Sequence, residues 1–238
     1  MDRGPDVCNL TYVTVSYAES SKGRAMSDAV LKPKLRGWFH LGMAPLVQLA
    51  GLILLVVTPT LVGRVGVAVY LVAATLLFGI SAVYHLGRWR PETTAVLRRL
   101  DHANIFVFIA GTYTPLALML LEPPQATLLL GLVWGIAIVG ITVKMVWMAA
   151  PRWLYTMLYI GMGWVAVGWL LPFWRSGGPA VVALIVLGGL VYSAGAFVYA
   201  RKRPDPFPAW FGFHEIFHAC TVVAALCHFA AITIAVLR

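Results

Sequence analysis

The stretch VGVAVYLVAATLLFGISAVYHL, residues 65–86, decides the fold, because its 22 residues include no Asp, Glu, Lys or Arg. As an α-helix rising about 1.5 Å per residue, it is long enough to cross the roughly 30 Å hydrocarbon core of a bilayer. Similar apolar stretches recur along the chain, with short links between them. They predict seven transmembrane spans, at residues 38–62, 65–86, 102–121, 126–148, 153–173, 179–200 and 211–237.

The composition supports the same class of protein. Hydrophobic residues make up 61% of the chain and charged residues 11%, whereas a soluble domain has about 25% charged residues. Strands are not expected, because an open sheet edge in lipid leaves backbone groups unpaired and the alternation of a barrel is missing. We therefore predict an all-α fold, a single seven-transmembrane helix bundle over residues 38–238. Residues 1–37 are polar and lack the apolar core of a signal peptide, which predicts a flexible cytoplasmic tail with Met26 as an alternative start.

The basic residues predict how the chain is oriented. A net charge of +9 in a soluble protein suggests a nucleic-acid partner, but here Lys and Arg lie at the ends of apolar spans and none is expected. Fifteen of the 18 lie in the N-terminal tail, in the second-to-third link, in the fourth-to-fifth region from Lys144 to Arg152, and in the sixth-to-seventh link. The positive-inside rule then places the N-terminus in the cytoplasm and the C-terminus outside. The chain is predicted to be a multi-pass protein of the cell (plasma) membrane.

Ionisable side chains in a membrane span are costly and usually functional, and the few in this chain occur near span ends. Ser81 and His85 close the second span, Asp101 precedes the third, and His214 and His218 open the seventh. The two histidines of the seventh span are four residues apart, so they share one face of a helix. With the predicted orientation, all five groups lie at a similar depth on the cytoplasmic side.

This convergence predicts a zinc site whose ligands are His85, His214 and His218. Three imidazoles leave one coordination position open, as in catalytic zinc, whereas structural zinc is usually closed by four protein ligands. Asp101 is predicted to orient or deprotonate the bound water, and Ser81 to hydrogen-bond the water or the oxyanion. These two residues are the predicted catalytic groups.

Other polar residues in the spans have simpler interpretations. A lone histidine in a membrane is more often a hydrogen-bonding partner between helices than a ligand, and we interpret His40, His102 and His228 in this way. Cys220 and Cys227 lie about 10 Å apart along one predicted helix, which is too far for a disulfide. They are interpreted as packing residues.

Residues 214–218 spell HEIFH, which matches the HExxH signature of zinc proteases, where the Glu is the general base. Intramembrane metalloproteases place this motif in an early span and take an Asp from a later one. Here the motif lies in the last span and Asp101 precedes it. Glu215 also lies about 100° from His214 around the helix and is expected near the cytoplasmic interface, so we rank proteolysis third among the possible activities.

Three stretches together resemble the haemolysin III branch of the progestin and adiponectin Q receptor (PAQR) family, and the resemblance extends over residues 32–237. They are SAVYH at residues 81–85, RLDHAN to GTYTP at residues 99–115, and RPDPFP to GFHEIFH at residues 203–218. The resemblance implies a cytoplasmic N-terminus and a zinc ion bound by the three histidines on the cytoplasmic side, beside the Asp and the Ser. Adiponectin receptors of this family are credited with hydrolysing the amide of ceramide, and alkaline ceramidases share the same residue set. Bacterial relatives have been linked to haemolysis and to membrane lipid homeostasis.

Two functions follow as hypotheses. The first is a zinc-dependent hydrolase of lipid amide or ester bonds, which requires a cavity open to lipid and has a membrane lipid as its partner. The second is a sensor of membrane state or a haemolysin-like cytolysin, in which zinc only fixes helix packing. No protein hormone is expected as a partner, because the chain has no extracellular domain to receive one.

Overall fold

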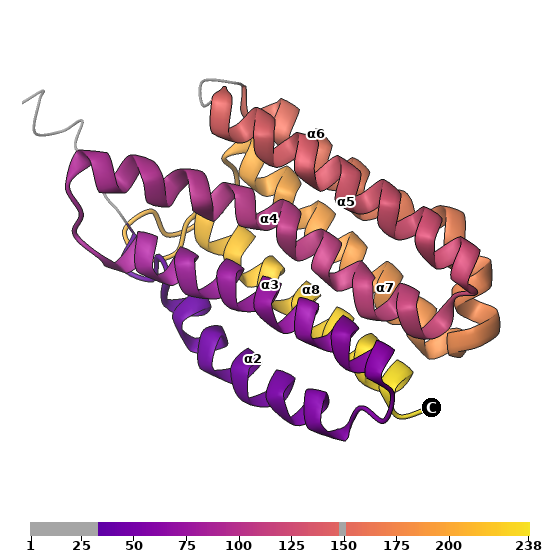
Figure 1. Cartoon of the computed structure of the whole chain (residues 1–238). Coiled ribbons are helices and arrows are strands. Elements are labelled where there is room, and N and C mark those ends of the chain that lie inside the picture. The colour runs from indigo at the N-terminus through magenta and orange to yellow at the C-terminus, as the bar shows by residue number, and fades with distance from the viewer. Residues whose placement is uncertain (1–32, 148–150) are drawn as a thin grey trace, which may run out of the picture.

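The computed structural model describes residues 33–147 and 151–238, and these are helical almost throughout (Figure 1). Within these residues no strand forms, and a single β-bridge joins Phe207 to Phe211. The all-α prediction is therefore confirmed for the described residues. The elements are α2 (Trp38–Val57), α3 (Leu61–Leu86), α4 (Pro91–Leu120), α5 (Pro123–Val146), α6 (Arg152–Gly163), the 3-10 helix η1 (Trp164–Trp169), α7 (Leu170–Arg201) and α8 (Phe213–Val236).

Six helical stretches in the described ranges are long and apolar enough to cross a membrane. Five of them are α2, α3, α4, α5 and α8, and the sixth is the continuous stretch Trp153–Arg201 of 49 residues. This last stretch contains both the fifth and the sixth predicted spans. Its helix is kinked at Gly178, where φ is 77° and ψ is 177°, next to the predicted start of the sixth span at Pro179. The chain is thus a multi-pass membrane protein.

The third predicted span began too late. It was placed at residues 102–121, but α4 begins at Pro91 and ends at Leu120. Pro91 occupies the first turn, where a missing N–H costs nothing, and Glu92 is favourable at the positive end of the helix dipole. Hydropathy detects the length of chain in lipid, not the polar turns that extend the helix beyond it. Asp101 consequently lies inside a helix and not at its entrance.

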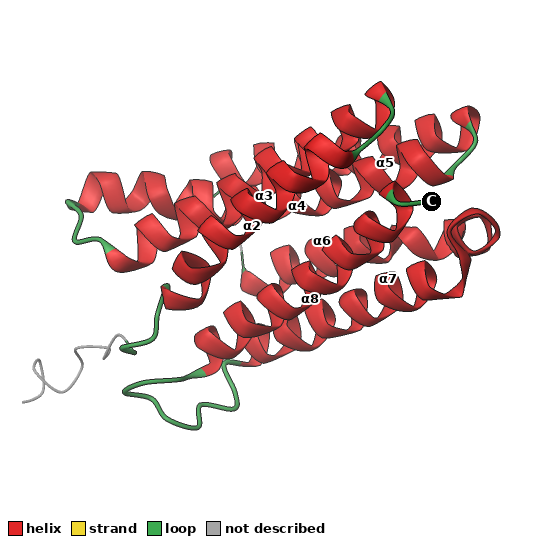
Figure 2. Cartoon of the chain, turned by 90° about the horizontal axis from the view of Figure 1, so that it is seen from below, coloured by secondary structure: helices red, strands yellow, loops and turns green. Residues whose placement is uncertain are grey.

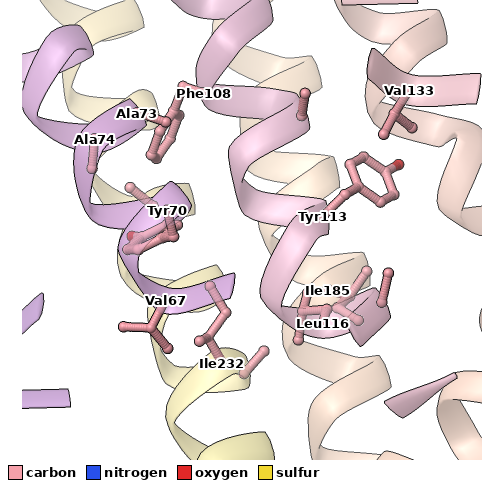
Figure 3. Packing of buried hydrophobic residues seen from close by; sticks show 14 of the residues in the cluster. Val67, Tyr70, Ala73, Ala74, Phe108, Tyr113, Leu116, Val133, Ile185 and Ile232 are labelled. Carbon is pink, nitrogen blue, oxygen red and sulfur yellow. The ribbon is translucent and has the colours of Figure 1, made fainter. Parts of the chain in front are cut away.

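Helix α4 is the most buried of the six, whereas α2 and α5 lie at the periphery and expose apolar side chains. The core contains side chains of α3, α4, α5, α7 and α8 (Figure 3). Small residues bring α3 and α4 close together, since a Cβ on Gly66 would lie 2.8 Å from the Pro115 Cα. This close packing holds the start of α3 against the last turns of α4. Figure 2 shows α7 and α8 side by side.

The segment before α2 is held against the loop between α7 and α8. The backbone N–H of Lys34 donates to the Ala209 carbonyl at 3.0 Å, and that of Leu35 to the Trp210 carbonyl at 3.2 Å. Most of the predicted flexible tail, including Met26, lies outside the described residues. Its described part, residues 33–37, is anchored by these bonds.

Candidate metal centre

Three histidine side chains meet where the end of α3 packs against the start of α8. His85 lies in the last turn of α3, and His214 and His218 lie on successive turns at the start of α8. One ring nitrogen from each residue lies within 4.8 Å of the other two. The i, i+4 spacing therefore places His214 and His218 beside His85, as the sequence predicted, although the two helices are separated by more than 120 residues.

The spacing of one pair of these nitrogens matches that of two ligands of a zinc ion. The Nε2 atoms of His85 and His214 are 3.3 Å apart. Two nitrogen ligands at about 2.0–2.1 Å from a tetrahedral zinc lie roughly 3.3–3.4 Å from each other. His85 and His218 are both buried, and His214 is partly buried. The donor set suits zinc better than magnesium or calcium, which prefer oxygen ligands.

The two predicted catalytic residues lie beside this cluster. The Asp101 Oδ2 atom is 3.7 Å from the His85 Nε2 atom. Ser81 lies one turn before His85 on α3 and is 1% exposed. Its hydroxyl is next to the Asp101 carboxyl, but it makes no hydrogen bond of normal geometry with any described residue. A buried hydroxyl beside a carboxylate and three imidazoles is suited to bind a polar group that enters the site.

The remaining histidines differ from one another in their environments. His228 Nε2 lies 3.3 Å from the Ile185 carbonyl on α7, which confirms the predicted bond between helices. His102 Nδ1 instead donates to the Arg98 carbonyl in its own helix at 2.6 Å.

His40 was wrongly predicted to bond between helices, because neither of its ring nitrogens has a hydrogen-bond partner among the described residues. Its ring packs on that of His218, with centroids 4.0 Å apart, and against the edge of Phe78. His40 therefore supports a predicted ligand by direct contact. No sequence motif pointed to this contact.

Glu215 was expected near the membrane interface, but it is 1% exposed. Its Oε1 atom accepts a hydrogen bond from Arg36 Nε at 2.8 Å, and its Oε2 atom accepts from the Gly212 backbone N–H at 2.9 Å. Both oxygens are therefore engaged in holding the first turn of α8. A glutamate at the third position of a helix is a known capping residue, and this was the signal in the sequence that could have identified its role.

Residues 36–40, which we term the collar, contact all three candidate ligands or their neighbours. Arg36 binds Glu215, next to His214. Gly37 adopts a φ of +87°, and a Cβ added there would lie 2.8 Å from the Cβ of His85. His40 packs on His218. The start of α2 thus acts as a wall of the site.

The cluster lies at one end of a large apolar chamber. The space between its lining atoms is about 1350 Å³, including its open mouth. At one end the lining includes His40, Ser81, Asp101, His214 and His218. The other lining residues are mostly apolar and lie on α3, α4, α6, α7 and α8, among them Leu116, Phe173 and Ile185. The chamber therefore reaches two of the three candidate ligands, His214 and His218.

Comparison with known proteins agrees with this architecture. Residues 29–229 match the family model described as Haemolysin-III related. The chain is similar to the Hemolysin-3 homolog of Bacillus subtilis (strain 168), with 32% identity over 185 residues, covering 75% of this chain and 82% of the relative. It is also similar to Hemolysin-3 of Bacillus cereus, with 30% identity covering 71% and 79% of the two chains. The Heptahelical transmembrane protein ADIPOR2 of Oryza sativa subsp. japonica is 29% identical over 183 residues, covering 70% and 80%. This multi-pass membrane protein belongs to the Haemolysin-III-related family.

Proposed function

We propose that this chain is a zinc-dependent hydrolase that cleaves an amide or ester bond of a membrane lipid, with a role in membrane lipid homeostasis. The observation that carries the proposal is that three imidazoles, a carboxylate and a buried hydroxyl lie at one end of an apolar chamber. Such a chamber accommodates an acyl chain, and the polar end receives the bond that is cleaved. His85, His214 and His218 would hold the metal.

The proposal includes seven passes with the N-terminus in the cytoplasm and the C-terminus outside. The count of seven passes is supported by the kink at Gly178, which divides the longest apolar stretch into two lengths of about one span each. The asymmetry of basic residues along the sequence supports the orientation. The name of the rice relative also describes that protein as heptahelical. On this topology the metal centre faces the cytoplasmic leaflet.

A zinc ion held by the three histidines would supply positive charge that polarises a carbonyl group and makes water more acidic. Hydrolysis adds OH to the carbonyl carbon and a proton to the leaving nitrogen or oxygen. Asp101 Oδ2 takes the proton from the attacking water and transfers it to the leaving atom. The Ser81 hydroxyl donates a hydrogen bond to the carbonyl oxygen as negative charge develops on it. The apolar walls bind the acyl chain and exclude bulk water.

The experiment compares purified wild type with Asp101→Asn, using release of fatty acid from fluorescent amide and ester lipids together with elemental analysis for zinc. Loss of a general acid or base costs about 10² to 10⁴ in rate. We therefore expect Asp101→Asn to retain zinc and to lose activity by this factor, whereas Ser81→Ala should lose less. If Asp101→Asn retains zinc and wild-type hydrolysis, the proposed mechanism is wrong.

A second candidate is a membrane-state sensor or cytolysin with a structural zinc, and it is favoured by the name Hemolysin-3 of the Bacillus cereus relative. It predicts lysis of erythrocytes or a change in membrane state that is independent of Asp101. This candidate would rank first under three results. Asp101→Asn would retain zinc, neither wild type nor Asp101→Asn would hydrolyse lipid, and the lytic effect would be the same in both.

A further inference from the structure

A second group of polar side chains lies deeper in the bundle, on α3, α7 and α8. The hydroxyls of Tyr70 and Tyr192 and the Nδ1 atom of His228 are buried and have no hydrogen-bond partner among the described residues. The Tyr192 and His228 rings are 5.7 Å apart between centroids, and the Tyr70 ring lies 6.1 Å from that of Phe229, the residue after His228. Buried polar groups are nearly always hydrogen-bonded in native structures, so three together indicate a missing partner.

This group is separate from the metal centre, but two of its three members line the same chamber. Tyr192 and His228 line the cavity that also reaches His218 and Asp101. His228 follows His218 by ten residues on α8, which corresponds to roughly 15 Å along the helix. A ligand that extends from the metal centre into the chamber therefore passes these two side chains. They lie about half the thickness of the hydrocarbon core away from the metal centre.

The hydrogen-bonding capacity of the group defines the chemistry of its partner. The Ile185 carbonyl can only accept, so the His228 Nε2 atom bound to it carries the hydrogen and Nδ1 of the neutral ring is an acceptor. The two tyrosine hydroxyls can each donate. One acceptor and two donors match an alcohol, which donates one hydrogen bond and accepts two. A ketone or a carboxylate has no hydrogen for Nδ1, whereas an alcohol carried on an apolar chain can supply it inside an apolar chamber.

We propose that Tyr192 and His228, assisted by Tyr70, bind a hydroxyl group on the acyl chain of the lipid. The distance from the metal centre, roughly 15 Å, places this hydroxyl about a dozen methylene groups from the bond that is cleaved. The ligand class is therefore a long-chain lipid hydroxylated in the middle of its chain. The inference rests on the proposed function for the identity of the cleaved bond, but binding of the hydroxyl requires no catalysis.

The test measures binding of three free acids to the purified full-length protein in detergent, by displacement of a fluorescent fatty acid. The probes are octadecanoic acid, 12-hydroxyoctadecanoic acid and 2-hydroxyoctadecanoic acid. Each buried hydrogen bond changes affinity by about 2- to 12-fold. We expect the 12-hydroxy acid to bind about tenfold more tightly than octadecanoic acid, and Tyr192→Phe to reduce this preference at least twofold. Affinity for the 2-hydroxy acid should be the same in wild type and Tyr192→Phe.

Tyr113→Phe is the matched control, because Tyr113 also lines the chamber but its hydroxyl already donates to the Gly163 carbonyl at 2.6 Å. This control should leave the preference unchanged. His228→Leu should remove the preference for the 12-hydroxy acid. If His228→Leu does not fold, Tyr192→Phe still tests the proposal. Equal affinity of wild type for the 12-hydroxy acid and octadecanoic acid, or an unchanged preference in Tyr192→Phe, overturns the proposal. Asp101→Asn should retain the preference, so a protein that shows it without hydrolysing any lipid counts against the proposed function alone.

Discussion

The bond between Arg36 and Glu215 gives the sharpest prediction about the metal centre. Replacing Glu215 by Gln keeps the shape of the side chain but removes its charge at a partly buried pair, in which the exposed fractions are 20% for Arg36 and 1% for Glu215. A hydrogen bond to a charged partner contributes about 1–2 kcal/mol more than one between neutral groups. This free energy holds the first turn of α8, which carries His214.

Loss of this free energy lowers the fraction of molecules in which the first turn is formed, and metal affinity falls with that fraction. An energy of about 1–2 kcal/mol corresponds to a factor of about 5–30 in an equilibrium constant. We therefore expect Glu215→Gln to weaken zinc binding, by at most about 5- to 30-fold, with hydrolysis restored at saturating zinc. The measurement is competition with a chelator of known affinity, followed by the visible spectrum of the cobalt-substituted protein.

Arg64→Gln is the control for Arg36→Gln, because the Arg64 Nε atom also donates a bond of 2.8 Å, to the Thr58 carbonyl far from the metal centre. Arg36→Gln should weaken zinc binding and Arg64→Gln should not. The double variant Arg36→Gln/Glu215→Gln should cost less than the sum of the two single changes, because both remove the same interaction. Wild-type zinc affinity in Glu215→Gln, with activity lost, would refute this reasoning and restore the general-base role of a zinc protease.

Three further predictions concern the same site and its orientation. Wild type should contain about one zinc per chain by elemental analysis, and His214→Ala/His218→Ala should contain none, so full occupancy in this variant would exclude the assigned ligands. Gly37→Ala should weaken zinc binding by about tenfold or more, because a left-handed backbone with a Cβ costs roughly 1–2 kcal/mol and the added atom meets His85. Gly42→Ala is the control, because nothing lies within 4 Å of the added atom. This variant should bind zinc like wild type. A C-terminal tag on intact cells should be accessible from outside, and a tag accessible only from the cytoplasm contradicts the orientation.

The sequence was sufficient to predict the helical class and the convergence of the three histidines. Spans are set by long-range properties of the chain, namely length and hydropathy, and the spacing of His214 and His218 fixes their common face. Counting the passes then predicts that the end of α3 and the start of α8 lie on the same side of the membrane. These features depend on local periodicity and on a simple rule for orientation, so no knowledge of side-chain packing was needed.

The collar could not be predicted in the same way. Arg36 and Glu215 are 179 positions apart, and no periodicity links a residue before the first span to one in the last. His40 looked like an isolated histidine in the membrane, and its contact with His218 depends on how α2 packs against α8. The extra turns of α4 were missed because a hydropathy window does not include polar residues that continue a helix outside the hydrocarbon region.

The HExxH spelling shows why the role of a residue has to be derived from its contacts. In a zinc protease the glutamate acts as general base on the water at the metal, so one of its oxygens must be available to that water. Here one oxygen of Glu215 binds Arg36 and the other binds the Gly212 N–H. The carboxylate close to the histidine cluster is Asp101, 3.7 Å from the His85 Nε2 atom, and it comes from a different helix. In the mechanism that we propose, proton transfer is therefore assigned to an aspartate outside the motif, while the glutamate within it holds the helix on which two of the candidate ligands lie.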